Sequence, residues 1–417
     1  MIKPYFFACT LLLTFYSAFA QLTSLDSAAI APQTLYFTIE QGGLVGPGAD
    51  RIQQEIQDNQ FFLLGEYHGS HQLSLLTKQL LYPMKLAGYR AFALEVGPVT
   101  AEKLDELSAD PQTTKERLQA FYEQYTLYDE TREYAAEPAP FFDRPADWDF
   151  LAEATIYDFD LWGLDQEYYY SMGFLFDDIM ATKGSYKVDS AKLEADFAKA
   201  KFFLQQELKK ELNTEAGYSL MSRLLASDSI RTFFAHFPSH RPAQKIIQAL
   251  QTSWKLYQHN ETGQWYENNN LRAKYMKQNF YRQYIQGLNK YRTLPNVFVK
   301  MGGMHLGRGA SPMEVYDLGN MITELADMNQ TASVHILCMN RYYQTDKQLE
   351  DEIGGGRESA FYPILVQAKK DQWTLIELRP FLKTVFYMGK TRHQTNPEME
   401  HLIKSFDYVL IPPVDGE

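Results

Sequence analysis

The sequence predicts an α/β protein with a mainly parallel central sheet, flanking helices and a helical insertion over the crevice at the strand ends. Four short apolar runs are separated by segments with helical patterns, which is typical of buried parallel strands. Each run ends in carboxylates or histidines, and the ligand crevice of an open parallel sheet lies beyond the carboxyl ends of its strands. The four runs span residues 61–64, 91–94, 161–164 and 297–301.

The first twenty residues have the pattern of a secretory signal peptide. Lys3 gives a positive start, residues 5–16 are mostly apolar, and Ala18-Phe19-Ala20 is a small-x-small cleavage site. The apolar stretch is shorter than the roughly 20 residues that cross a bilayer. We therefore expect an exported protein, periplasmic or secreted, with no transmembrane segment after signal removal.

Composition narrows the class of partner. The 417 residues are 45% hydrophobic and carry a formal net charge of -12. An acidic chain is a poor match for nucleic acid, so we expect a small-molecule or peptide substrate. Only Cys338 remains after signal removal, which leaves no intramolecular disulfide. We expect residues 21–417 to form a single α/β domain, and the oligomeric state stays open.

The elements follow in a strand and helix alternation. After the first strand, residues 71–87 have helical spacing of leucines and end at Gly88. Helical insertions are expected at about residues 100–150 and 185–290, on either side of the third strand. The chain returns to the sheet at residues 296–301, and a helix is expected at 315–328. Further strands are expected at residues 333–339, 361–367, 373–378 and 408–411.

The polar residues at the strand ends predict a catalytic or metal site. They are Glu66, His68, Glu95, Asp165 and His305. A histidine beside a carboxylate is suited to activating water as a general base. The same mixture of nitrogen and oxygen atoms also suits zinc, manganese or iron, with His68, Glu95 and His305 as conditional ligands. His71 begins a helix three residues after His68, and is either a partner in the site or an exposed residue of the first turn.

Four motifs resemble a known superfamily in their order and approximate separation. They cover residues 64–69, 93–95, 162–165 and 300–305, including Gly65-Glu66-Tyr67-His68 and Gly302-Gly303-Met304-His305. The superfamily groups the erythromycin esterases, the ChaN-like haem-binding proteins and the TraB/Tiki proteins.

The branches of this superfamily imply different chemistry. Residues 269–279 are similar to an Arg-x-x-x-Met-x-x-Asn pattern of the erythromycin esterases, which implies that Arg272 faces the site and binds substrate. The Tiki resemblance implies a divalent-metal peptidase using His68, Glu95 and His305. The ChaN-like resemblance implies haem or iron binding instead. We expect a hydrolase that acts on an ester or amide, with a haem- or iron-binding protein as the alternative.

Overall fold

The computed structural model describes residues 25–41, 43–129, 134–142, 144–185, 189–214, 217–344, 349–353, 360–387 and 396–414. The expected signal peptide, residues 1–20, lies outside this range. The chain is an α/β protein with many helices and a mixed, mostly parallel sheet of nine strands, which confirms the predicted fold class. No helix in the described ranges is long and apolar enough to cross a membrane.

The chain divides into two compact units, residues 52–335 and residues 1–51 with 336–417. The larger unit holds all four predicted strand ends. Its sheet strands run parallel in the order β3-β8-β4-β7. Their bounds are β3 (Phe61–Glu66), β4 (Tyr89–Leu94), β7 (Asp160–Gly163) and β8 (Asn296–Gly302), and a separate hairpin pairs β5 (Leu127–Asp129) with β6 (Tyr134–Ala136).

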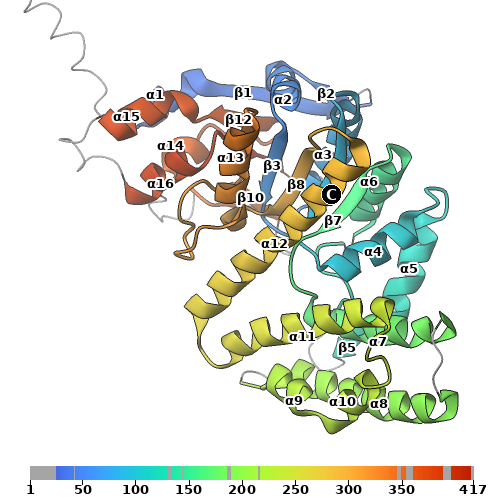
Figure 1. Cartoon of the computed structure of the whole chain (residues 1–417). Coiled ribbons are helices and arrows are strands. Elements are labelled where there is room, and N and C mark those ends of the chain that lie inside the picture. Colours follow the sequence, from blue (N-terminus) through green and yellow to red (C-terminus); the bar gives the residue numbers. More distant parts are fainter. Residues whose placement is uncertain are drawn as a thin grey trace, which may run out of the picture. The chain divides into compact units, whose positions relative to one another are not determined.

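Helices fill the connections between these strands. The first connection is α3 (His71–Leu86), and the second contains α4 (Pro98–Ser108), α5 (Thr114–Tyr125) and α6 (Pro145–Ile156). The long third connection comprises η2 (Tyr169–Ser171), α7 (Met172–Ala181), η3 (Thr182–Ser185), α8 (Ser190–Leu212), α9 (Leu220–Ala226), α10 (Asp228–Phe234), α11 (Arg241–Glu261) and α12 (Trp265–Tyr291). After β8 come η4 (Gly303–His305) and α13 (Leu318–Asn329). Figure 1 shows α7 to α11 gathered at the bottom of the view, with α12 rising from them toward β8.

Alternation along the strands gives the sheet of this unit two apolar faces. On one face, Phe61 and Val299 pack with Phe280 of α12 and Ile322 of α13 in one buried cluster. On the other face, the Phe92 and Phe298 rings stack with centroids 4.7 Å apart, and Phe150 of α6 meets the edge of the Phe92 ring. Because both faces are covered, the strands are buried over most of their length, including their carboxyl ends.

The smaller unit contains the antiparallel part of the fold. Strand β1 (Thr34–Glu40) pairs with β2 (Gly43–Val45) and with β12 (Trp373–Glu377), which pairs in turn with β13 (Tyr408–Ile411). Strand β9 (Ser333–Cys338) begins in the larger unit and ends in the smaller one, where it runs parallel to β13. The remaining elements are α1 (Ser27–Ile30), η1 (Ala31–Gln33), α2 (Pro47–Asp58, which crosses the boundary), β10 (Tyr342–Gln344), β11 (Leu349–Asp351), α14 (Tyr362–Leu365), η5 (Arg379–Phe381), α15 (Leu382–Tyr387) and α16 (Pro397–Ser405).

One predicted strand is wrong. Residues 361–367 were expected to be extended because they form a short apolar run, but they contain the helix α14. Pro363 stands in the first turn of this helix, where its fixed φ favours helix and its missing N–H is not needed. A short apolar run does not distinguish a strand from a buried helical turn.

Candidate functional site

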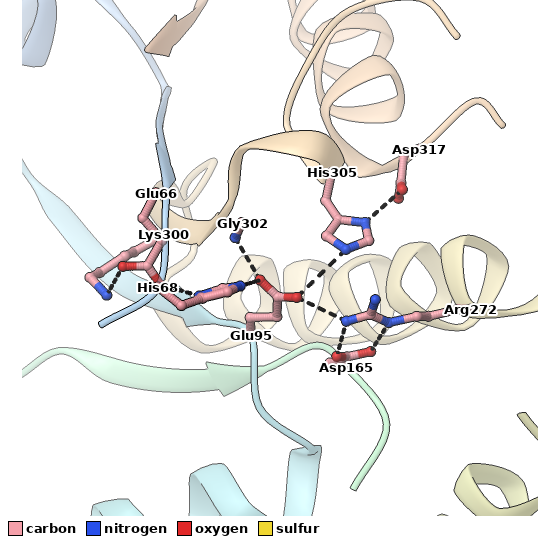
Figure 2. Close-up of polar contacts among 9 residues, drawn as sticks. All are labelled: Glu66, His68, Glu95, Asp165, Arg272, Lys300, Gly302, His305 and Asp317. Atoms are coloured by element: carbon pink, nitrogen blue, oxygen red, sulfur yellow. Dashed lines mark hydrogen bonds and ion pairs between the residues drawn. The ribbon is translucent and has the colours of Figure 1, made fainter. Parts of the chain in front are cut away.

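The carboxyl ends of four parallel strands bring the predicted polar residues into one network (Figure 2). Glu66 is the last residue of β3, and Glu95 follows β4 directly. Asp165 comes two residues after β7, and His305 lies in η4 just after β8. The larger unit therefore assembles side chains that are more than 200 residues apart in the sequence.

Glu95 is the centre of the network. Its side chain is 4% exposed. One oxygen, Oε2, accepts a hydrogen bond from the Gly302 backbone N–H at 2.5 Å, and the other, Oε1, accepts one from Arg272 Nη2 at 2.8 Å. These two bonds fix the plane of the carboxylate and balance its charge.

Arg272 links Glu95 to Asp165. From α12 it donates through Nε to Asp165 Oδ1 at 3.0 Å and through Nη2 to Oδ2 at 2.6 Å, which is the two-point geometry of an arginine on a carboxylate. Burial acts to lower the pKa of Arg272, but Asp165 and Glu95 outweigh it and raise the pKa above its ordinary value. The guanidinium therefore stays charged and keeps the two carboxylates together.

His68 is the solvent-facing member. Its side chain is 38% exposed, and its Nδ1 lies 3.4 Å from Glu66 Oε1. Its Nε2 lies 3.8 Å from Glu95 Oε2, beyond direct hydrogen-bonding distance. The ring of Phe141 stacks on the imidazole with centroids 3.8 Å apart and 12° between the planes, which holds the ring orientation.

Glu66 is held ionised by a residue on the neighbouring strand. Lys300 of β8 donates from Nζ to Glu66 Oε2, and both side chains are buried. Burial alone would raise the pKa of Glu66, but Lys300 and His68 lower it below its usual range. An ionised Glu66 accepts a hydrogen bond from His68 Nδ1–H and so leaves Nε2 as the unprotonated, basic nitrogen.

His305 is oriented by a second carboxylate, that of Asp317. Its Nδ1 donates to Asp317 Oδ2 at 2.7 Å, and its Nε2 lies 3.5 Å from Glu95 Oε1. Burial acts to lower the pKa of His305, but the hydrogen bond to Asp317 and the charge of Glu95 outweigh burial and raise the pKa. Asp317 also caps α13 by accepting the Leu318 N–H at 2.7 Å, which fixes its position.

Gly302 leaves room at the centre of the site. A Cβ atom on this residue would lie 3.1 Å from Glu95 Oε2 and 3.2 Å from His68 Nε2. Its φ of -51° is accessible to any residue, so the requirement for glycine at this position is one of space.

His71 does not join this network. It is the first residue of α3 and is exposed. Within the part of the chain that the structure describes, it forms no hydrogen bond or ion pair with the site residues. Of the two interpretations of this residue, the geometry favours the exposed first turn.

The side chains of the site do not match a metal centre. Both oxygens of Glu95 already accept hydrogen bonds, and a permanently charged guanidinium touches one of them. A divalent cation between His68, Glu95 and His305 would have to displace that contact and lie beside a like charge. Among the described residues, no group of three or more His, Cys, Asp or Glu side chains is arranged to hold a metal ion.

Three residues of the site were not predicted from the sequence. Lys300 had a weak signal, since it is the one charge in an otherwise apolar strand. Asp317 is the N-cap of α13 and lies within residues 315–328, where a helix was expected, but nothing in that pattern indicated that it contacts His305. Phe141 lies in a loop with a φ of 68°, and its sequence neighbourhood carried no signal for this contact.

Solved structures resemble this chain over nearly its whole length. A mutant of the erythromycin esterase EreC in its open conformation aligns with a TM-score of 0.54 and 13% identity, covering 91% of this chain and 96% of its own. A succinoglycan biosynthesis protein aligns with a TM-score of 0.54 and 14% identity, covering 93% and 96%. A protein of Bacillus cereus aligns with a TM-score of 0.50 and 13% identity, covering 87% and 90%.

Sequence comparison adds nothing to these structural matches. No protein-family model matches the chain, and no curated protein sequence matches it significantly. At such low identity the structural likeness concerns the fold. The chain has an erythromycin esterase-like fold.

Proposed function

We propose that this protein is a hydrolase that uses His68 to activate water against an ester or amide. The observation that carries the proposal is the position of His68. Its Nδ1 faces the buried carboxylate of Glu66, and its Nε2 is directed at the 3.8 Å gap before Glu95. Two polar atoms this close can share one water that lies to the side of the line joining them, and the exposed face of His68 is open to solvent.

The reaction follows from these positions. His68 Nε2 takes a proton from the bridging water as the water oxygen bonds to the substrate carbonyl carbon. The carbonyl oxygen becomes an oxyanion, and the raised pKa of His305 suits its Nε2 to donate a hydrogen bond to that oxygen. The imidazolium of His68 then protonates the leaving alcohol or amine as the bond from carbon to that group breaks.

The remaining residues act by positioning. Arg272 and the Gly302 N–H hold Glu95 in place, and Asp165 orients the guanidinium. Glu66 sets the tautomer of His68, and Lys300 keeps Glu66 ionised. No step requires a covalent enzyme intermediate or a metal ion.

The test is turnover of a panel of p-nitrophenyl esters, lactones and chromogenic amides by the purified protein, with and without a chelator. We expect hydrolysis that a chelator leaves unchanged and that His68→Gln lowers about 10²-fold to 10⁴-fold. His71→Gln is the matched control, because it changes an exposed histidine three residues away. Equal activity in the two variants would remove His68 from the mechanism. An intense visible absorption band after haem addition, without any hydrolysis, would support the haem-binding alternative instead.

We also propose that the mature protein is exported. The support is the charged start, short apolar stretch and small-x-small site within residues 1–20. Mass measurement of the protein recovered from cell fractions tests this proposal. A cytoplasmic protein that retains its first twenty residues would contradict it.

A further inference from the structure

A basic groove lies between α11, α12 and the start of α4, outside the network of Figure 2. It consists of two adjoining clefts of about 370 Å³ and about 310 Å³, which share Thr252 and Tyr275. Arg241, Lys245 and Arg282 are the charged residues that line the first cleft. Lys255 and Lys274 are those that line the second.

The two helices of this groove lack acidic residues over most of their length. Residues 241–260 and residues 268–291 contain no Asp or Glu, although acidic residues outnumber basic ones 52 to 40 in the whole chain. The groove is therefore positively charged although the protein as a whole is negatively charged. A concave surface lined by one sign of charge concentrates ligands of the opposite sign.

Most of this charge is not neutralised within the described ranges of the chain. Lys245 pairs with Glu102 of α4. No ion pair is formed there by Arg241, Lys255, Lys274 or Arg282, and the Arg282 guanidinium donates only to a neutral oxygen, Asn279 Oδ1, at 3.4 Å. Four cationic side chains are thus available to an anion.

The uncharged lining mixes apolar side chains, such as Val99 and Leu256, with polar ones. Gln244, Gln248, Thr252 and Gln278 present amide and hydroxyl groups that both donate and accept hydrogen bonds. Tyr275 adds an aromatic ring, and it stands three residues after Arg272 on α12. Lys274 and Arg282 line different clefts and are eight residues, or about 12 Å, apart along the α12 axis, so a ligand with two anionic groups, which both long side chains can reach, fits better than a single small ion.

We propose that this groove binds a polar small molecule that carries two or more carboxylate or phosphate groups. The site is separate from the water-activating residues, and the proposal does not depend on hydrolysis. Tyr275 and Arg272 lie on successive turns of one helix, which places the bound anion beside the wall of the catalytic site.

The test is calorimetric titration of the whole protein with two probes, tripolyphosphate for phosphate groups and citrate for carboxylate groups. We expect at least one probe to bind, and binding to weaken as salt rises from about 0.05 M to about 0.5 M, because salt screens the attraction. The double variant Lys274→Gln/Arg282→Gln should weaken binding about tenfold or more. Binding of only one probe would assign the ligand to that chemical class.

The matched control is the double variant Lys192→Gln/Lys209→Gln. It makes the same change in net charge on α8, at two exposed lysines that lie outside the groove. We expect its affinity to equal that of the unmodified protein, with all variants showing the same circular dichroism spectrum. If both double variants lost affinity equally, the effect would come from net charge alone, and the proposal would be overturned. Failure of both probes to bind at millimolar concentration would overturn it as well.

Discussion

His305 Nδ1 lies 2.7 Å from Asp317 Oδ2, and both side chains are more than nine-tenths buried. Because Asp317 is fixed as the N-cap of α13, the helix itself sets the direction of the imidazole. The Nε2 atom is thereby turned toward Glu95. Glu95 thus lies between two histidines, each of which has its own carboxylate on Nδ1.

Asp317→Asn should reduce stability most at acid pH. The amide can still cap α13, but it removes the charge that raises the pKa of His305 against the effect of burial. A raised histidine pKa contributes stability that is fully present below the ordinary pKa and is lost as pH rises through the folded value. We expect a loss of about 1–2 kcal/mol near pH 6 that shrinks toward pH 9, measured by urea unfolding.

Asp189→Asn is the control for this substitution. Asp189 is an exposed N-cap residue whose side chain accepts the Lys192 N–H of α8 at 3.2 Å. The control should change stability by less than about 0.5 kcal/mol, with no comparable dependence between pH 6 and pH 9. A loss of the same size in both variants at every pH would mean that Asp317 acts only as a helix cap.

Gly302→Ala should reduce catalysis without unfolding the protein. The added methyl group would occupy the space between His68 Nε2 and Glu95 Oε2, where the proposal places the water. The backbone conformation accepts alanine, so we expect kcat/KM to fall about 10-fold to 100-fold with little change in melting temperature.

Gly173→Ala is the corresponding control. Gly173 lies inside α7, and its nearest contact to an added Cβ would be an ordinary 3.6 Å to Tyr125. Alanine should leave the activity unchanged and change stability by less than about 0.5 kcal/mol, because Gly173 is only the second residue of the helix and the added methyl group meets no close contact. If Gly302→Ala keeps full activity, the gap between His68 and Glu95 is not where water reacts.

Arg272→Lys should show that the site needs the planar, multiply donating guanidinium group of Arg272 as well as its positive charge. An ammonium group cannot make the two-point contact with Asp165 while also donating to Glu95. We expect a loss of about 2–4 kcal/mol in unfolding free energy, because buried carboxylates lose partners, together with at least a tenfold fall in kcat. Arg231→Lys is the same change at an exposed arginine of α10 (Asp228–Phe234), outside the site and the groove, and should leave both quantities unaltered.

The sequence predicted the parallel part of the fold and most members of the polar network at the strand ends, and it did so for one physical reason. Buried parallel strands are apolar along their length, so the first polar residue after each strand marks its carboxyl end, and neighbouring ends converge. Glu95, Asp165 and His305 have this position, and Glu66 is the last residue of its strand. Arg272 was reached through resemblance alone, since a helix residue carries no comparable signal.

The elements and site residues that the sequence did not predict were missed for physical reasons as well. The antiparallel strand β1 was not recognised, because residues 34–40 alternate only weakly between apolar and polar side chains. Asp317 contacts His305 through tertiary packing twelve residues away, which no spacing rule encodes. In the sequence, Lys300 is only a charged residue within an apolar strand. Its partner, Glu66, becomes evident only once the structure places strand β3 beside strand β8.

Lys300→Met should raise the pKa of Glu66 and shift its protonation toward neutral pH. In the unmodified protein, burial raises this pKa, but Lys300 and His68 outweigh burial and lower it. A lowered carboxyl pKa contributes stability that is present above the ordinary value and is lost as pH falls through the folded value. Without Lys300, burial dominates, so the loss of activity and stability on acidification should begin at a higher pH.

The measurement is a pH profile of kcat/KM together with urea unfolding between about pH 4 and pH 8. We expect Lys300→Met to lose about 3–5 kcal/mol near neutral pH, because it leaves a buried carboxylate without its cation. The double variant Lys300→Met/Glu66→Gln should recover much of that stability, since no buried charge remains, while its activity stays low because His68 has lost the carboxylate that orients it. A double variant as unstable as Lys300→Met would show that Lys300 acts by packing against Phe150, over whose ring its ammonium group lies at 5.4 Å, and not through Glu66.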